Sequence, residues 1–139
     1  HATQEFRAGI YSDAFTDLTY RTLLAEAENS LRRSQGVIVD ATFQDAKQRR
    51  RFLDLADRLN VPTVFVECQA AEAEILRRLE KRAGAENEAS DATREVYLRQ
   101  RSEFMPMVEV PADAHVVVKT DAAPAEVLDQ LESVFDRGA

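Results

Sequence analysis

Asp40 is the residue whose type and position most clearly suit chemistry. It follows Val37–Val39, a run of β-branched residues that predicts a strand buried on both faces, as in a parallel sheet. A carboxylate at the carboxyl end of such a strand lies at the sheet edge where α/β proteins bind ligands. Thr42 can add a hydroxyl to the same site. A capping or turn aspartate and an ordinary loop threonine are the alternatives that the residues leave open.

A second group of candidates is basic. Arg78 and Arg82 are one turn apart (i, i+4) in a helix predicted over 71–82, so they share a face. Each guanidinium presents a planar fork of donors that suits phosphoryl oxygens. The small, polar and acidic segment 84–90 follows and predicts a loop. The alternative is a solvated helix face on which Glu74 forms surface pairs with the two arginines.

The helix expected after Asp40 carries further arginines. Arg49, Arg50 and Arg51 are consecutive, so they point in different directions around the helix, and we expect them to be mostly solvated. Phe43, in the preceding loop, is expected to pack against the protein rather than to stack on a substrate.

The elements that must position these residues alternate between helices and strands. We expect helices over 13–33, 45–59, 71–82, 91–104 and from Pro124 onwards, and strands over 37–39, 63–68 and 115–119. Residues 1–12 are expected to form a loop or tail. The alternation implies crossover connections and an α/β fold, with one parallel sheet and helices on both faces.

Composition excludes several classes of function. The 139 residues include 18 Lys and Arg against 25 Asp and Glu, a net charge of −7, which makes general nucleic-acid binding unlikely as a function. No apolar run approaches the roughly 20 residues of a membrane helix, so no membrane is expected. One cysteine and two histidines give little support to a zinc site or to a catalytic triad. The single cysteine suits a reducing cytosol, so we expect a cytoplasmic protein.

Glycine is scarce, and this restricts the chemistry further. The four glycines are Gly9, Gly36, Gly84 and Gly138. No two are close enough to form a glycine-rich phosphate loop, and none is followed by Lys-Ser or Lys-Thr. The sequence therefore carries neither a Walker A loop nor a dinucleotide fingerprint.

Several segments together resemble a known family. These are Val37-Ile38-Val39-Asp40-Ala41-Thr42-Phe43, the basic helix after it, Asn60-Val61-Pro62, Val64-Phe65-Val66-Glu67-Cys68, and upstream Gly9-Ile10-Tyr11-Ser12 and Thr19-Tyr20. The set resembles P-loop kinase-like ATP-binding domains of the AAA-33 type, relatives of gluconate kinase and of the kinase half of polynucleotide kinase. Domains of this type are often fused behind an aminoglycoside-phosphotransferase-like domain. The resemblance extends from about Arg7 to about Leu131.

The resemblance implies that the fold is incomplete here. In that family a first strand, the G-x-x-x-x-G-K-[ST] loop, a helix and a second strand come upstream. Residues 1–139 are therefore expected to be the C-terminal portion of one three-layer P-loop kinase-like domain, with three strands and about five helices. The missing first strand would lie between 37–39 and 63–67. This gap could be filled by an upstream segment or by another chain, so an oligomer is possible.

The resemblance also implies roles for the candidate residues. Asp40 becomes Walker-B-like and would hold a water bound to Mg²⁺, or orient an arginine of a lid over about 77–104. Arg78 and Arg82 lie in that lid and would reach over the transferred phosphate, where charge spreads over the oxygens.

Two further residues follow the last expected strand. In this fold the segment containing Thr120 and Asp121 runs near the adenine, so the resemblance implies that they help to bind ATP. A plain turn before Pro124 is the alternative for both.

Three functions remain open at this stage. The first is an ATP- and Mg²⁺-dependent phosphotransferase for a small-molecule acceptor, with the phosphate loop and the catalytic base upstream. The second is a nucleotide-binding regulatory domain with little or no turnover, and the third is a small structural α/β module. A phosphate loop in the upstream sequence would favour the first two, and acceptor-dependent ATP turnover would separate them.

Overall fold

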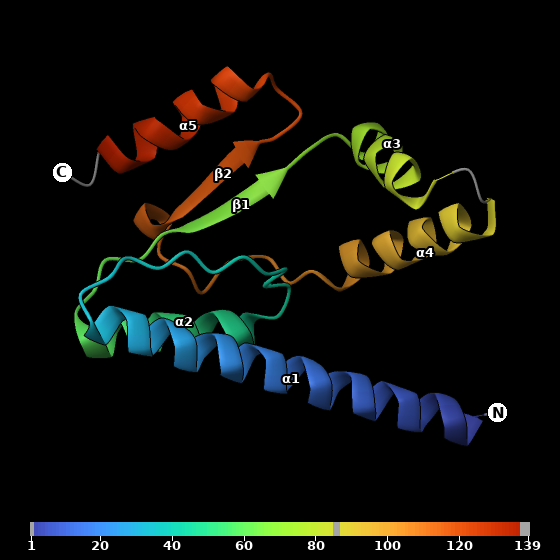
Figure 1. Cartoon of the computed structure of the whole chain (residues 1–139), viewed down its shortest axis with the longest axis horizontal. Helices are drawn as coiled ribbons and strands as arrows, with labels where there is room; N and C mark the ends of the chain where they lie inside the picture. Colours follow the sequence, from blue (N-terminus) through green and yellow to red (C-terminus); the bar gives the residue numbers. More distant parts are fainter. Residues whose placement is uncertain (1, 85–86, 137–139) are drawn as a thin grey trace. The chain divides into compact units, whose positions relative to one another are not determined.

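A computed structural model gives the fold of the chain (Figure 1). It describes the backbone of residues 2–84 and 87–136, and the side chains of 13–84 and 93–136. The chain divides into two compact units, His1–Pro62 and Thr63–Ala139. The two units are considered separately.

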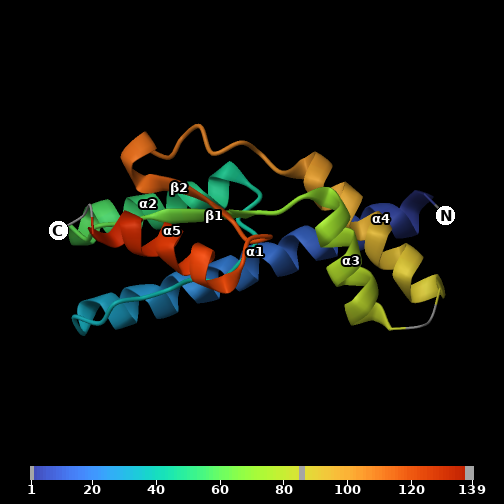
Figure 2. The ribbon, with the colours of Figure 1, turned by 90° about the horizontal axis from the view of Figure 1, so that it is seen from above.

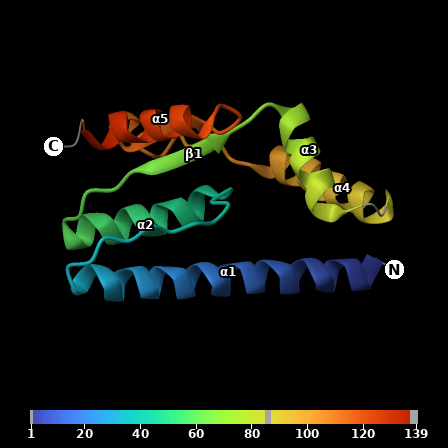
Figure 3. The same cartoon turned by 45° about the horizontal axis from the view of Figure 1, so that its top comes forward.

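The first unit is a pair of helices that lie side by side (Figure 3). Helix α1 spans Ala2–Arg32 and helix α2 spans Ala46–Leu59. The predicted loop over 1–12 is wrong for residues 2–12, which continue α1. A single Gly9 does not end a helix, because glycine costs only about 1 kcal/mol relative to alanine and its neighbours include good helix formers.

Helix α1 ends at Arg32, one residue before the predicted end at 33. Ser34 takes the left-handed conformation, with φ of 60°. The N–H of Gln35 donates to the Ser30 carbonyl at 3.1 Å, and the N–H of Ser34 donates to the Leu31 carbonyl at 3.0 Å. This is the Schellman arrangement that satisfies the last carbonyls of a helix.

Helix α2 confirms the prediction made from its apolar spacing. Asp45 caps it, and its side chain accepts a hydrogen bond from the N–H of Lys47 at 2.8 Å. Asn60, with φ of 55°, ends the helix in the left-handed conformation. The face of α2 toward the core of the unit carries Phe52, Leu55 and Ala56, all buried.

The strand predicted over 37–39 does not form. These residues are irregular chain outside any strand, and Ile38 is 97% exposed. A strand needs a neighbouring strand for its backbone hydrogen bonds, and the described part of this unit contains helices and irregular chain only. The apolar run is therefore a potential strand without a partner.

The second unit is built on two parallel strands. Strand β1 spans Phe65–Gln69 and strand β2 spans His115–Lys119, paired in register from Phe65 with His115 to Gln69 with Lys119. The predicted parallel pairing is confirmed, but the described sheet has two strands instead of three. Phe65 and Val118 are buried.

In its described residues the second unit has three α-helices besides this pair. They are α3 (Glu72–Ala83), α4 (Asn87–Glu103) and α5 (Pro124–Asp136), with a short 3-10 helix η1 (Ala112–Ala114) before β2. Helix α5 packs on β2, and α3 and α4 pack on each other (Figure 2). The loop predicted over 84–90 is shorter than expected, since residues 87–90 begin α4, while residues 85–86 lie outside the described residues.

The architecture is a mixed α/β fold of the P-loop kinase-like type, with five α-helices in the described residues. None of these helices combines the length and the apolar character that a membrane crossing requires.

Candidate functional site

The carboxyl ends of β1 and β2 lie at one edge, because the two strands are parallel. The segment after β2 is attached to the end of β1 there. The backbone N–H of Thr120 donates to the Gln69 carbonyl at 2.8 Å, and the Thr120 hydroxyl donates to the same oxygen at 3.2 Å. Both strands therefore end in one hydrogen-bonded segment.

Asp121 connects this segment to the start of α3. Its Oδ2 accepts a hydrogen bond from the backbone N–H of Ala71 at 2.9 Å. Ala71 is the N-cap of α3 and has no side chain to cap the helix. Asp121 thus acts as a cap from 50 residues away in sequence, and one of its carboxylate oxygens is engaged in the fold.

Arg78 lies at the same edge. Its Nη2 donates to the Thr120 carbonyl at 2.8 Å, and its Nε donates to Glu74 at 2.9 Å. Glu74 also pairs with Arg77 at 2.7 Å. Hydrogen bonds from Arg77 first and Arg78 second lower the pKa of Glu74 to about 2. The structure therefore brings Arg78, Thr120 and Asp121 together at this edge, while the Glu74–Arg78 pair is the surface pair that the alternative interpretation of α3 expects.

Arg82 lies one turn further along α3 and differs from Arg78. Its side chain is exposed. Among the residues that the structure describes, no hydrogen bond or ion pair involves it. Its guanidinium can therefore meet an anionic ligand without losing a contact with any described residue.

An ion pair joins the two helices of the predicted lid. Arg101 on α4 donates to Glu72 in the first turn of α3 at 2.7 Å. Both side chains are largely exposed, so the pair stabilises the contact only weakly. Residues 85–86 of the predicted lid, which connect the two helices, lie outside the described part of the chain.

Asp40 and Thr42 belong to the first unit. Asp40 is exposed, and within the described residues its side chain makes no hydrogen bond or ion pair. The Thr42 hydroxyl lies 3.2 Å from the Tyr20 hydroxyl. The carboxylate is thus open to a ligand, whereas the threonine hydroxyl already has a partner in the protein.

Phe43 is held by its backbone as well as by its ring. It has φ of 45°, a conformation that costs free energy for a bulky residue. Its N–H donates to the Tyr20 hydroxyl at 2.9 Å, and its carbonyl accepts from Nη1 of Arg49 at 2.6 Å. Phe43 is 8% exposed, and its ring packs edge to face against the ring of Phe52, with 5.1 Å between the ring centroids. The expectation that Phe43 packs is confirmed.

The prediction that Arg49 is solvated is wrong. Its relative exposure is 0%, whereas Arg50 is exposed and Arg51 is half-buried in an ion pair with Asp17. Sequence reasoning missed Arg49, although a signal was present. Arg49 lies three residues before Phe52 and therefore falls on the apolar face of α2.

No carboxylate cluster marks a metal site by itself. Within the described residues no group of three or more His, Cys, Asp or Glu could hold a metal ion. One open carboxylate is nevertheless compatible with Mg²⁺, which keeps several waters and is often bound by one or two carboxylates together with substrate phosphates. Asp40 fits that requirement.

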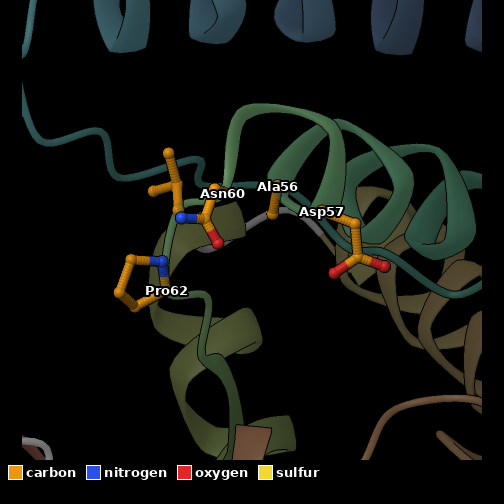
Figure 4. Close-up of a pocket in the computed structure, with 5 residues that line it drawn as sticks. Ala56, Asp57, Asn60 and Pro62 are labelled. Carbon is orange, nitrogen blue, oxygen red and sulfur yellow. The ribbon is translucent and has the colours of Figure 1, made fainter.

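The first unit also has an open hollow of about 290 Å³ at the end of α2 (Figure 4). Its lining consists of Ala56, Asp57, Asn60, Val61 and Pro62. None of the predicted site residues lines it, so it is not the site described above.

Comparison with known proteins supplies the family. The AAA domain family, of the AAA-33 type, matches residues 2–107, and the chain belongs to it. This family is one of P-loop nucleotide-binding domains of the kinase-like class. No curated protein and no solved structure matches the chain. Thr120 and Asp121 lie beyond the matched stretch, so the geometry at the sheet edge is the independent support for them.

Proposed function

We propose that the complete protein is an ATP-dependent phosphotransferase for a small-molecule acceptor, and that residues 1–139 are the C-terminal portion of its kinase-like domain. The observation that carries the proposal is the position of Arg78 at the carboxyl edge of the parallel strands, bound to the Thr120 carbonyl. Ligands of α/β proteins bind at this edge. The exposed Arg82 adds a second cation on the same helix.

In this proposal the region 77–104 is a lid, and its arginines act on the transferred phosphoryl group. Arg82 has no competing contact among the described residues, so it can approach the phosphoryl oxygens as negative charge develops on them. Arg78 contributes from a fixed position, because Glu74 and the Thr120 carbonyl orient it.

Asp40, Thr42, Thr120 and Asp121 complete the assignment. Asp40 holds a water of the Mg²⁺ that accompanies ATP, which neutralises phosphate charge when bound. The Thr42 hydroxyl lies on the same segment and adds a polar group to the same site. Thr120 and Asp121 contact the nucleotide near its base. An upstream segment, or another chain, supplies the phosphate loop and fills the sheet. We place the activity in the cytoplasm.

The test is ATP turnover by the complete protein with a panel of small hydroxyl and amine acceptors. We expect ADP release that depends on an acceptor, and an Asp40→Asn variant that needs about 100-fold more Mg²⁺ for half-maximal turnover. Asp54→Asn is the matched control, because Asp54 is an exposed aspartate on α2.

Two results would overturn the proposal. Turnover by Asp40→Asn with the same Mg²⁺ dependence as Asp54→Asn would remove the assigned role of Asp40. ATP binding without turnover for any acceptor would favour a regulatory nucleotide-binding domain instead.

A further inference from the structure

The segment before α2 is held by two buried side chains that none of the assignments above uses. Tyr20 and Arg49 are 7% and 0% exposed, respectively. They contact the two backbone groups of Phe43: the Tyr20 hydroxyl accepts from its N–H, and the Arg49 guanidinium donates to its carbonyl. We call Tyr20, Phe43 and Arg49 the Phe43 clamp.

Apolar packing alone does not account for this arrangement. Burying a guanidinium is costly unless its donors are satisfied, and its bond to the Phe43 carbonyl is short, at 2.6 Å. Phe43 itself is held at φ of 45°, where a bulky residue is strained. Strain of this kind persists only where surrounding contacts determine the conformation, and it is concentrated at functional segments.

The clamp fixes one end of the segment that carries Asp40. Tyr20 also reaches the Thr42 hydroxyl at 3.2 Å, so Thr42 and Phe43 are both restrained. Asp40 lies two residues before Thr42 and keeps an exposed carboxylate. The result is a segment with a fixed backbone at 42–43 and a free acidic side chain just before it.

We infer that Arg49 is a positioning residue, which through the Phe43 carbonyl holds residues 40–43 in the conformation in which Asp40 meets the Mg²⁺ of Mg-ATP. This inference rests on the proposed role of Asp40. Its physical basis is that groups behind a metal-binding carboxylate orient it and tune metal affinity. Arg49 does so without contact with nucleotide or metal.

The experiment compares Arg49→Met, Arg49→Lys and the control Arg50→Met in the complete protein. Methionine fills much of the apolar volume but cannot donate to the carbonyl, and lysine keeps a charge and a donor. Arg50 is the next residue on α2 and is exposed. The readouts are the Kd for ATP with and without Mg²⁺ by calorimetry, the Mg²⁺ concentration for half-maximal turnover, and amide exchange at Phe43.

For Arg49→Met we expect binding and turnover to need about 10-fold more Mg²⁺ for half-maximal effect, together with faster Phe43 amide exchange and an unchanged Kd for metal-free ATP. Arg49→Lys should recover part of the loss, and Arg50→Met should match the wild type. A purely structural role for Arg49 would change stability and leave the Mg²⁺ dependence of the folded variant unaltered, and that result would overturn the inference.

Two features keep the outcome interpretable. If Arg49→Met does not fold, Tyr20→Phe removes the other contact of the clamp and should raise the Mg²⁺ requirement in the same direction; no change there would also overturn the inference. If the wild type binds Mg-ATP without turnover, the phosphotransferase proposal fails, while the calorimetric comparison still decides the role of Arg49. A complete protein that binds no Mg-ATP overturns both.

Discussion

Replacing Tyr20 by phenylalanine tests whether the Tyr20 hydroxyl holds Phe43 in place and stabilises the fold. The substitution removes a hydroxyl that accepts the Phe43 N–H at 2.9 Å and lies 3.2 Å from the Thr42 hydroxyl. The ring contact with Phe43, at 5.3 Å between centroids, can remain. Because Tyr20 is 7% exposed, water does not readily replace the lost acceptor, and such a loss costs about 1–3 kcal/mol.

That free energy converts into two measurements on the 139-residue chain. Each kcal/mol lowers the thermal midpoint of a domain of this size by about 2–8 °C. At about 1.4 kcal/mol per factor of ten, amide exchange at Phe43 should accelerate by roughly 5- to 140-fold if the amide exchanges through local opening. Exchange in α5 should not change, because α5 belongs to the other unit.

Tyr97→Phe is the matched control. Tyr97 is a partly exposed tyrosine on α4, and its hydroxyl makes no hydrogen bond with any described residue. It should melt within about 1 °C of the wild type, since surface changes without lost contacts are close to neutral. If Tyr20→Phe behaved like this control, with unchanged Phe43 exchange, the hydroxyl would not hold the segment and the reasoning would fail.

Three further predictions concern the second unit and the nucleotide. In the complete protein Arg82→Ala should lower kcat by about 100-fold with little change in the Kd for ATP, and Arg78→Ala should lower kcat less. The control Arg50→Ala should change neither kcat nor Kd. If both lid variants kept a near-normal kcat, the lid assignment would be lost. The pKa of Glu74 is about 2, against 4.5 ordinarily. Its pairing therefore stabilises the fold fully above pH 4.5 and less as pH falls toward 2. Between pH 4.5 and 2 the melting temperature of Glu74→Gln should therefore fall less than that of the wild type. The 139-residue chain alone should bind Mg-ATP more weakly than micromolar by calorimetry, because it has no phosphate loop.

The elements that the sequence predicts well are those whose contacts are local. The apolar spacing of α2 predicts a helix over 45–59, and the structure has it over Ala46–Leu59. The run Val37–Val39 has the composition of a strand but remains outside any strand. Strand formation depends on a partner elsewhere in the chain or in another segment, and composition does not report whether that partner is present.

The candidate site divides in the same way. Parallel strands bring their carboxyl ends together, so the grouping of Arg78 with Thr120 and Asp121 follows from the predicted topology. The burial of Arg49 does not follow from its residue type, because arginine is almost never fully buried unless paired. One of its hydrogen bonds goes to the backbone carbonyl of Phe43. Because every residue carries a carbonyl, the sequence does not identify this partner, even though the position of Arg49 on the apolar face is visible.

The two units restrain their candidate residues with contacts of different strength. In the first unit, the contacts that hold Phe43 are buried, so their loss leaves polar groups away from water. In the second, the bonds that Arg78 and Asp121 make to backbone groups are exposed, so water can replace them. A segment that must present one carboxylate to a metal benefits from the first kind of restraint. A helix that must approach and leave a phosphate during turnover needs the second, so the difference agrees with the proposal in which Asp40 is held in place and Arg82 moves.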